Sequence, residues 1–162
     1  MQLKFTSEGY LFPIGKITTD ISNFEQVFVN AFPTSTTRPR LWANYLQYIQ
    51  RFRQEVSNNF VQWLDGSFVT LKENPNDIDM VTFINYHLYE SMDAKQQLEH
   101  FWSYNLEYKG LDSYLMGVYP ESHRNYLKYQ KYCEDWHTRY CNTKQNKEVL
   151  YHVKGFIELR FE

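Results

Sequence analysis

The apolar positions before residue 33 predict an irregular arm followed by a short helix. Gly9, Pro13 and Gly15 punctuate the first fifteen residues, a composition typical of turns rather than of a regular element. Ser22 then precedes apolar residues at helical spacing, and Glu25 follows it by three positions. That arrangement is the capping box, so we expect a short helix that opens at Ser22.

The next segment carries the clearest helical pattern in the chain. Pro39 stands at a position where a first helical turn accepts proline. The apolar stripe that follows consists of Trp42, Tyr45, Leu46, Ile49, Phe52 and Val56. Because residues three and four apart share one side of a helix, this stripe predicts a buried face.

From residue 60 onwards, short apolar runs alternate with longer amphipathic segments. The runs that predict strands are Phe60–Leu64, Asp77–Asn85, Leu111–Val118 and Tyr151–Phe161. The segments that predict helices are Met92–Tyr108 and Tyr126–Tyr140, while Asn142–Lys147 is typical of a polar loop. This order predicts a single α/β (α+β) domain in which helices flank a mixed sheet. We expect residues 1–57 to form an arm and helices that precede a core at residues 58–162.

Length and charge narrow the classes of function. A chain of 162 residues can bury a sizeable core, and its net charge of −2 does not favour non-specific binding to nucleic acid. Its fourteen Tyr, twelve Phe and four Trp can supply both a core and a half-buried binding surface. Cys133 and Cys141 are expected as free thiols. Without a signal-peptide pattern or a membrane-length apolar run, we expect a cytoplasmic protein with no membrane contact.

Two carboxylates and a glycine-serine turn form the candidate site. Asp77 and Asp79 are two positions apart on a predicted strand, so their side chains share one face. Two carboxylates at the mouth of a buried strand repel each other, and Mg²⁺, which prefers oxygen ligands, would relieve that repulsion. The alternative is a turn-capping aspartate beside a solvated one. Gly66 and Ser67 form a turn that can offer N–H groups and a hydroxyl to phosphates.

This spacing resembles the signature of the polymerase-beta-like nucleotidyltransferase superfamily, and in particular a small, uncharacterised prokaryotic branch of it. The matching residues are Leu64-Gly66-Ser67, interrupted by Asp65, and then Asp77-Ile78-Asp79-Met80. The resemblance implies a nucleotidyltransferase-like mixed sheet and a third acidic residue on a later strand. Asp112 is the expected third carboxylate and metal ligand, with a turn residue as the alternative reading and Glu158 as its rival. Asp65 is given no role.

Two lysines are candidate contacts for the triphosphate. The superfamily often has an arginine shortly after the glycine-serine turn, and this chain has none there. Lys72 could replace it, although an exposed turn lysine is the plainer interpretation. Lys154 lies near Arg139, Lys144 and Lys147, a basic group that is either a phosphate contact or a solvated loop.

The resemblance implies a Mg²⁺-dependent nucleotidyltransferase, with two metal ions bound and ATP as the expected nucleoside triphosphate. The acceptor hydroxyl would belong to a protein, an RNA, a nucleotide or a small molecule. By analogy, the setting would be a toxin–antitoxin or phage-defence pair, and a homo-oligomer or a toxin partner is expected. The alternative is an inactive binding module or antitoxin that neutralises a protein partner through aromatic helices around Trp42 and Trp136.

Overall fold

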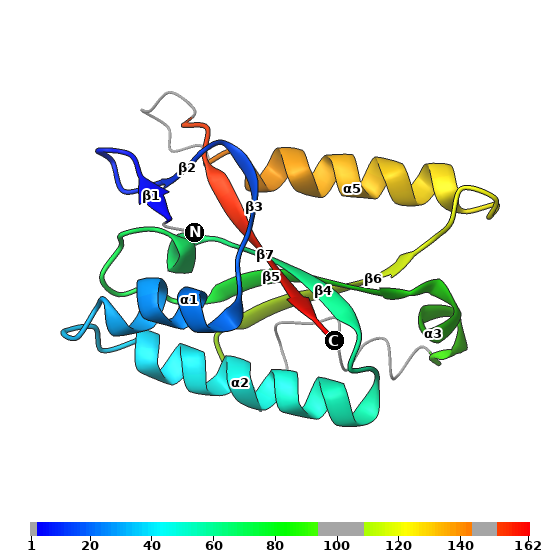
Figure 1. Ribbon diagram of the computed structural model, residues 1–162, viewed down its shortest axis with the longest axis horizontal. Coiled ribbons are helices and arrows are strands. Elements are labelled where there is room, and N and C mark those ends of the chain that lie inside the picture. The colour runs from blue at the N-terminus through cyan, green and yellow to red at the C-terminus, as the bar shows by residue number, and fades with distance from the viewer. Residues whose placement is uncertain (1–2, 94–108, 144–151) are drawn as a thin grey trace.

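A five-stranded mixed sheet forms the centre of the molecule in the computed structural model, which describes residues 3–93, 109–143 and 152–162. The strands, in sheet order, are β3 (Gly15–Thr18), β7 (Gly155–Phe161), β4 (Phe60–Asp65), β5 (Ile78–Asn85) and β6 (Leu111–Val118). The outer pairs β3/β7 and β5/β6 are parallel, and the inner pairs are antiparallel. The chain therefore forms a mixed α+β domain around one sheet (Figure 1).

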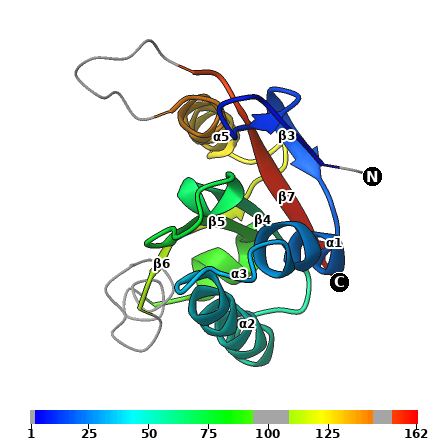
Figure 2. The same ribbon diagram turned by 90° about the vertical axis from the view of Figure 1, so that its left-hand side faces the viewer.

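Helices cover both faces of this sheet. The described helices are α1 (Ile21–Glu25), which continues as the π-helical turn η1 (Gln26–Asn30), α2 (Arg38–Glu55), α3 (Tyr86–Ser91) and α5 (Tyr126–Tyr140). Helices α1 and α2 lie on one side of the sheet and α5 lies on the other (Figure 2). The remaining elements are the small hairpin β1 (Lys4–Phe5) and β2 (Leu11–Phe12), and the 3₁₀ turn η2 (Ser67–Val69).

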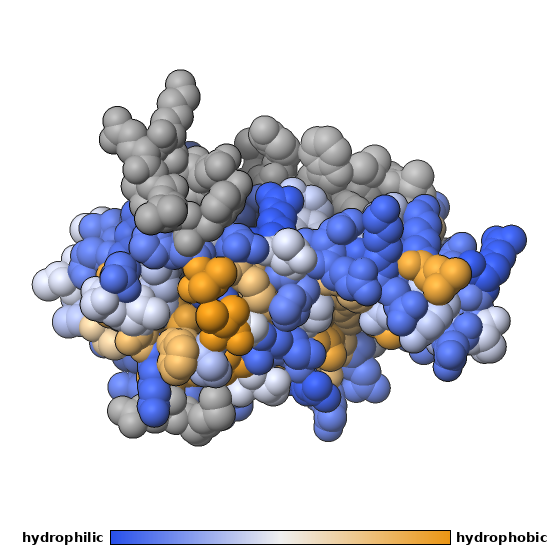
Figure 3. All heavy atoms as spheres, turned by 90° about the horizontal axis from the view of Figure 1, so that it is seen from above, coloured by the Kyte–Doolittle hydropathy of each residue, from blue (hydrophilic) through white to orange (hydrophobic). Residues whose placement is uncertain are grey.

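Each face of the sheet packs its own apolar core. The larger core lies between the sheet and α1 and α2, and includes the buried stripe residues Tyr45 and Phe52. The smaller core packs Val81 and Phe156 of the sheet against Tyr140 of α5. Seen from the α5 side, the surface is mostly hydrophilic, with small hydrophobic areas between polar side chains (Figure 3). Among the described helices, none combines the length and apolar character that crossing a membrane requires.

A buried arginine ties α2 to the loop that follows β4. Arg38 is fully buried, and its guanidinium donates to the carbonyl oxygens of Phe28, Phe68, Thr70 and Lys72 at 2.6–2.9 Å. Each carbonyl thereby gains a charge-assisted hydrogen bond in place of water. The backbone after the glycine-serine turn is therefore held by the start of α2.

Most of the predicted elements are confirmed, with small shifts at their ends. The helix at Pro39 is α2, the final helix is α5, and the strands predicted to begin at Phe60, Leu111 and Tyr151 are β4, β6 and β7, the last of which begins at Gly155. The third predicted strand starts at Ile78, so Asp77 immediately precedes it. The predicted helix at Met92–Tyr108 and the predicted loop at Asn142–Lys147 lie largely outside the described residues.

Four predictions are wrong. The arm is not irregular throughout, because β3 pairs with β7 at the edge of the main sheet. The first helix is capped by Asp20 and not by Ser22, since the Asp20 side chain accepts from the backbone N–H of Asn23. Leu46 is 41% exposed and leaves the stripe. Trp42 is buried against Phe24 and so cannot supply a partner interface.

Candidate functional site

Three aspartates form a row across adjacent strands. Asp65 at the end of β4 is the register partner of Asp79 on β5, and Asp79 is the register partner of Asp112 on β6. Register partners on neighbouring strands present their side chains on the same face. That face is the one packed against α5, because Trp63 and Tyr114, two residues along the same strands, belong to the α5 core. Asp112 thus lies beside Asp79, where a third carboxylate was predicted.

The glycine of the turn lets the Asp79 carboxylate approach the backbone. Gly66 has φ +77° and ψ −164°, a combination that is essentially restricted to glycine. A β-carbon placed on Gly66 would lie 1.8 Å from Oδ2 of Asp79. The predicted turn and the predicted strand therefore meet in direct contact, and no larger residue fits between them.

One cavity gathers most of the predicted site residues. We call it the acidic cavity; it has a volume of about 780 Å³. Its lining includes Asp65, Gly66, Ser67, Lys72, Asp77, Asp79, Arg139, Tyr140 and Lys154. Asp77 and Asp79 therefore face the same space, as their spacing predicts. Asp112 is in register with Asp79 but does not line this cavity.

Lys154 is buried and is the partner of Asp65. No role was predicted for Asp65 from the sequence. The Lys154 ammonium forms an ion pair with Asp65 and donates to the carbonyl oxygen of Tyr140 at 2.9 Å. Burial raises the pKa of the Asp65 carboxyl to about 6, against the opposing effect of Lys154. Because Lys154 is only 5% exposed, the solvated-loop alternative is wrong for it. Lys72, in contrast, is exposed at the rim of the acidic cavity.

Tyr140 brings a buried hydroxyl to the same place. Its side chain is 2% exposed, and its hydroxyl has no hydrogen-bond partner among the described residues. Burial raises the pKa of this phenol well above its usual 10, and the negative charges of Asp65 and Asp79 add to the effect. The group therefore stays protonated at neutral pH, and its hydroxyl can donate a hydrogen bond to an oxygen of a ligand. The sequence pattern places Tyr140 at the end of an aromatic helix and does not indicate that its hydroxyl is buried beside the aspartates.

Glu158, the rival third carboxylate, belongs to a separate network. It is the register partner of Trp63, which lies two residues before Asp65 on β4. Its buried carboxylate accepts from Lys16 at 2.7 Å, from the Trp63 indole at 3.0 Å and from Arg160 at 2.9 Å. Burial alone would raise the pKa of Glu158, but these donors hold it below the usual range. The carboxylate is thus occupied by structural partners.

The carboxylates of the acidic cavity can supply some, but not all, of the ligands of a Mg²⁺ ion. Within residues 3–93, 109–143 and 152–162, no three His, Cys, Asp or Glu side chains come together closely enough to hold a metal. Mg²⁺ is commonly bound by only one or two carboxylates, with substrate phosphates and water completing its shell. Asp77 and Asp79 on one cavity satisfy that smaller requirement. The geometry therefore fits an ion brought in with a triphosphate better than a preassembled metal site.

A family model matches almost the whole chain. The model of a family described as "Family of unknown function (DUF6932)" matches residues 3–160. No curated protein and no solved structure matches the chain.

Proposed function

The chain belongs to the DUF6932 family, and from its site we propose that it is a Mg²⁺-dependent nucleotidyltransferase that transfers a nucleoside monophosphate from a nucleoside triphosphate to a hydroxyl. The observation that carries the proposal is the contact of Asp79 with Gly66, with Asp77 on the same cavity. This contact brings together a carboxylate pair suited to Mg²⁺ and a backbone turn suited to phosphate. ATP is the triphosphate to test first.

The resemblance to polymerase-beta-like nucleotidyltransferases supports the proposal. The motif residues of that resemblance stand at the end of β4 and the start of β5, and Asp112 stands at the start of β6. The order helix, strand, turn, strand, helix, strand and helix from α2 to α5 accommodates the superfamily's core. The proposed fold relationship therefore rests on the motif, on the element order and on the register of Asp79 with Asp112.

The chemistry assigns a task to each group of residues. Asp77 and Asp79 would hold Mg²⁺, which on binding neutralises phosphate charge and lowers the pKa of the acceptor hydroxyl. Gly66 and Ser67 present the turn to the phosphates, and the Tyr140 hydroxyl donates to a phosphate oxygen. The acceptor oxygen forms a bond to the α-phosphorus while the bond from that phosphorus to its bridging oxygen breaks. Pyrophosphate leaves, and the acceptor proton passes to water.

Calorimetry with ATP, GTP, CTP and UTP, each with Mg²⁺, tests the proposal. We expect one of them to bind to the wild type and the affinity to collapse in Asp77→Asn/Asp79→Asn, because the variant keeps side-chain size but loses both charges. The matched control is Glu134→Gln/Asp135→Asn, which removes two exposed charges from α5. Absence of binding by every triphosphate at millimolar concentration would contradict the proposal.

Transfer itself requires a second measurement. Labelled triphosphate is incubated with cell lysate and each protein, and label is followed into protein, RNA and small molecules. Charge stabilisation at the phosphoryl group is usually the largest catalytic effect, so labelling should fall by orders of magnitude in the aspartate double variant. Equal labelling by both proteins rules out catalysis by this pair.

A second candidate function is a nucleotide-binding module without catalysis. It is favoured by the ion pair of Lys154 with Asp65, which neutralises the buried cation that a triphosphate would otherwise meet. Such a module would bind the Mg²⁺-triphosphate complex and transfer nothing. Binding by calorimetry together with no labelling in any lysate fraction would identify it.

A further inference from the structure

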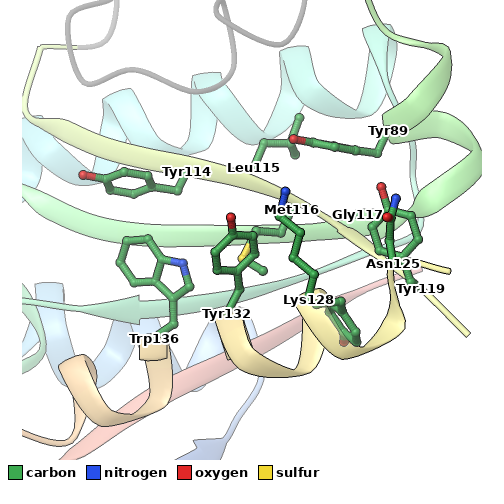
Figure 4. A pocket seen from close by; sticks show the side chains of 11 residues that line it. Tyr89, Tyr114, Leu115, Met116, Gly117, Tyr119, Asn125, Lys128, Tyr132 and Trp136 are labelled. Atoms are coloured by element: carbon green, nitrogen blue, oxygen red, sulfur yellow. The ribbon is translucent and has the colours of Figure 1, made fainter. Parts of the chain in front are cut away.

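A second cavity lies between the edge strand β6 and helix α5. We call it the tyrosine cavity; its volume is about 370 Å³. The side chains that line it are mostly aromatic: Tyr89, Tyr114, Tyr119, Tyr129, Tyr132 and Trp136. Figure 4 shows Tyr114 on the strand side, Tyr132 and Trp136 on the helix side, and Lys128 reaching between them. Tyr132 remains 46% exposed, so these rings do not simply complete the apolar core.

The tyrosine cavity lies next to the row of aspartates. Alternate residues of a strand share a face, so Asp112, Tyr114 and Met116 of β6 all point towards α5. Ring contacts continue the connection: Tyr114 lies 4.6 Å from Trp136, and Trp136 lies 5.4 Å from Tyr140, which lines the acidic cavity. Asp112 therefore stands between the two cavities. A ligand in the tyrosine cavity would be on the opposite side of Asp79 from the Gly66 turn.

The lining selects a planar ring that carries an anionic group. Tyrosine and tryptophan faces stack on heteroaromatic rings, and stacking of this kind binds nucleobases with little regard to sequence. Asn125 offers an amide that can pair with a ring edge. Lys128 brings an ammonium to the same space, 5.6 Å from the centroid of the Tyr132 ring. The volume matches one small ligand and is too small for a partner helix.

We propose that the tyrosine cavity binds one nucleotide, with its base among Tyr114, Tyr132 and Trp136 and its phosphate on Lys128. In this pose the base lies on the side of the cavity nearer the aspartate row, and the phosphate lies on the far side, because α5 runs from Lys128 towards Tyr140. Binding of this nucleotide does not depend on the proposed nucleotidyltransferase function. The nucleotide is either free or the end of an RNA, since both carry the same base, sugar and phosphate.

The test measures binding of AMP, GMP, CMP and UMP by calorimetry in excess EDTA, so that no divalent ion contributes. We expect the wild type to bind at least one monophosphate more tightly than the matching nucleoside. Lys128→Met should remove that difference, whereas the control Lys131→Met, an exposed lysine outside the cavity, should keep it. Tyr132→Ala should weaken binding by about tenfold, the size expected for loss of one stacking ring. The control Leu127→Ala, at a 78% exposed position, should not.

Absence of binding by all four monophosphates at millimolar concentration would overturn the proposal, as would affinities unchanged by Lys128→Met and Tyr132→Ala. A tetraribonucleotide that competes more strongly than the monomer marks an RNA end as the source, and a weaker one marks the free nucleotide; both support the cavity. In Asp77→Asn/Asp79→Asn, monophosphate binding in EDTA should be retained. Failure of Mg²⁺-triphosphate binding beside retained monophosphate binding would remove the proposed transfer alone, and the reverse pattern would remove this cavity alone.

Discussion

Asp79 lies against the α-carbon of Gly66, so closely that an added β-carbon would sit 1.8 Å from its carboxylate oxygen. This contact joins the end of β4 to β5 through side chain and backbone as well as through the strand ladder. It also directs the Asp79 carboxylate towards the turn. The pairing of β4 with β5 therefore also fixes the position of the Asp79 carboxylate at the turn.

Gly66→Ala is expected to destabilise the protein and to abolish triphosphate binding. Backbone strain in this glycine-only region costs about 1–3 kcal/mol, and displacement of Asp79 adds to it. Gly15→Ala is the matched control, because Gly15 also has a positive φ (+102°) but only His137 lies near its added β-carbon, at 3.9 Å. Urea unfolding measures both. Equal losses in the two variants would show that Asp79 is not displaced, and adding Asp79→Ala to Gly66→Ala should recover the excess loss.

The local pattern predicted the residues that meet at this contact but not the complete row. The spacing of Asp77 and Asp79 predicted that their carboxylates share one face, whereas Asp112 was expected only through the resemblance to nucleotidyltransferases. Asp65 was overlooked because its importance comes from its register with Asp79, and register across antiparallel strands depends on the tertiary pairing. The sequence did offer one signal: Asp65 lies two residues after Trp63, so both side chains point to the same face of β4.

Two other features depend on long-range packing. Strand β3 has only four residues and begins at a glycine, and it exists because β7, about 140 positions later in the chain, pairs with it. Tyr140 was expected on the final helix, yet only the docking of α5 on the sheet buries its hydroxyl beside the aspartates. Helical periodicity identifies a face and does not identify what that face meets.

Arg38→Lys is expected to lower stability by at least about 3 kcal/mol, because one ammonium cannot replace the planar fork that reaches four carbonyls. Burial lowers the pKa of Arg38 to about 10, so the wild-type side chain remains charged at neutral pH. Triphosphate affinity should fall as well, since three of the carbonyls, of Phe68, Thr70 and Lys72, follow the Gly66 turn.

The control for this change is Arg40→Lys on the same helix. Arg40 is exposed and donates a long hydrogen bond, 3.4 Å to the carbonyl oxygen of Lys109, so its replacement should change stability by less than about 0.5 kcal/mol. Urea unfolding compares the two. Similar values for both variants would mean that the buried guanidinium does not organise the loop.

The raised pKa of Asp65 predicts a pH dependence of stability. Its folded-state pKa is about 6, above the usual 3.8, so between these values the folded protein retains a proton that the unfolded chain has released. The contribution of this group to stability is therefore fully present below about pH 4 and is lost as the pH rises through about 6. Asp65→Asn should remove that fall. Unfolding free energies measured across this range for both proteins check the slope, and parallel curves would contradict the assignment to Asp65.

Tyr140→Phe separates a structural role from a binding role. The Tyr140 hydroxyl is buried without a partner among the described residues, so its removal takes away an unpaired polar group and should leave stability unchanged or slightly higher. Tyr45→Phe is the matched control: the Tyr45 hydroxyl donates to Gln62 at 2.6 Å in the core, and its loss should cost about 1–3 kcal/mol. If the Tyr140 hydroxyl donates to a phosphate oxygen, Tyr140→Phe should weaken Mg²⁺-triphosphate binding about tenfold, whereas Tyr45→Phe should leave it unchanged while folded. A loss of stability in Tyr140→Phe as large as in Tyr45→Phe would show that the hydroxyl already has a structural partner. Unchanged triphosphate affinity would show that the ligand does not reach it.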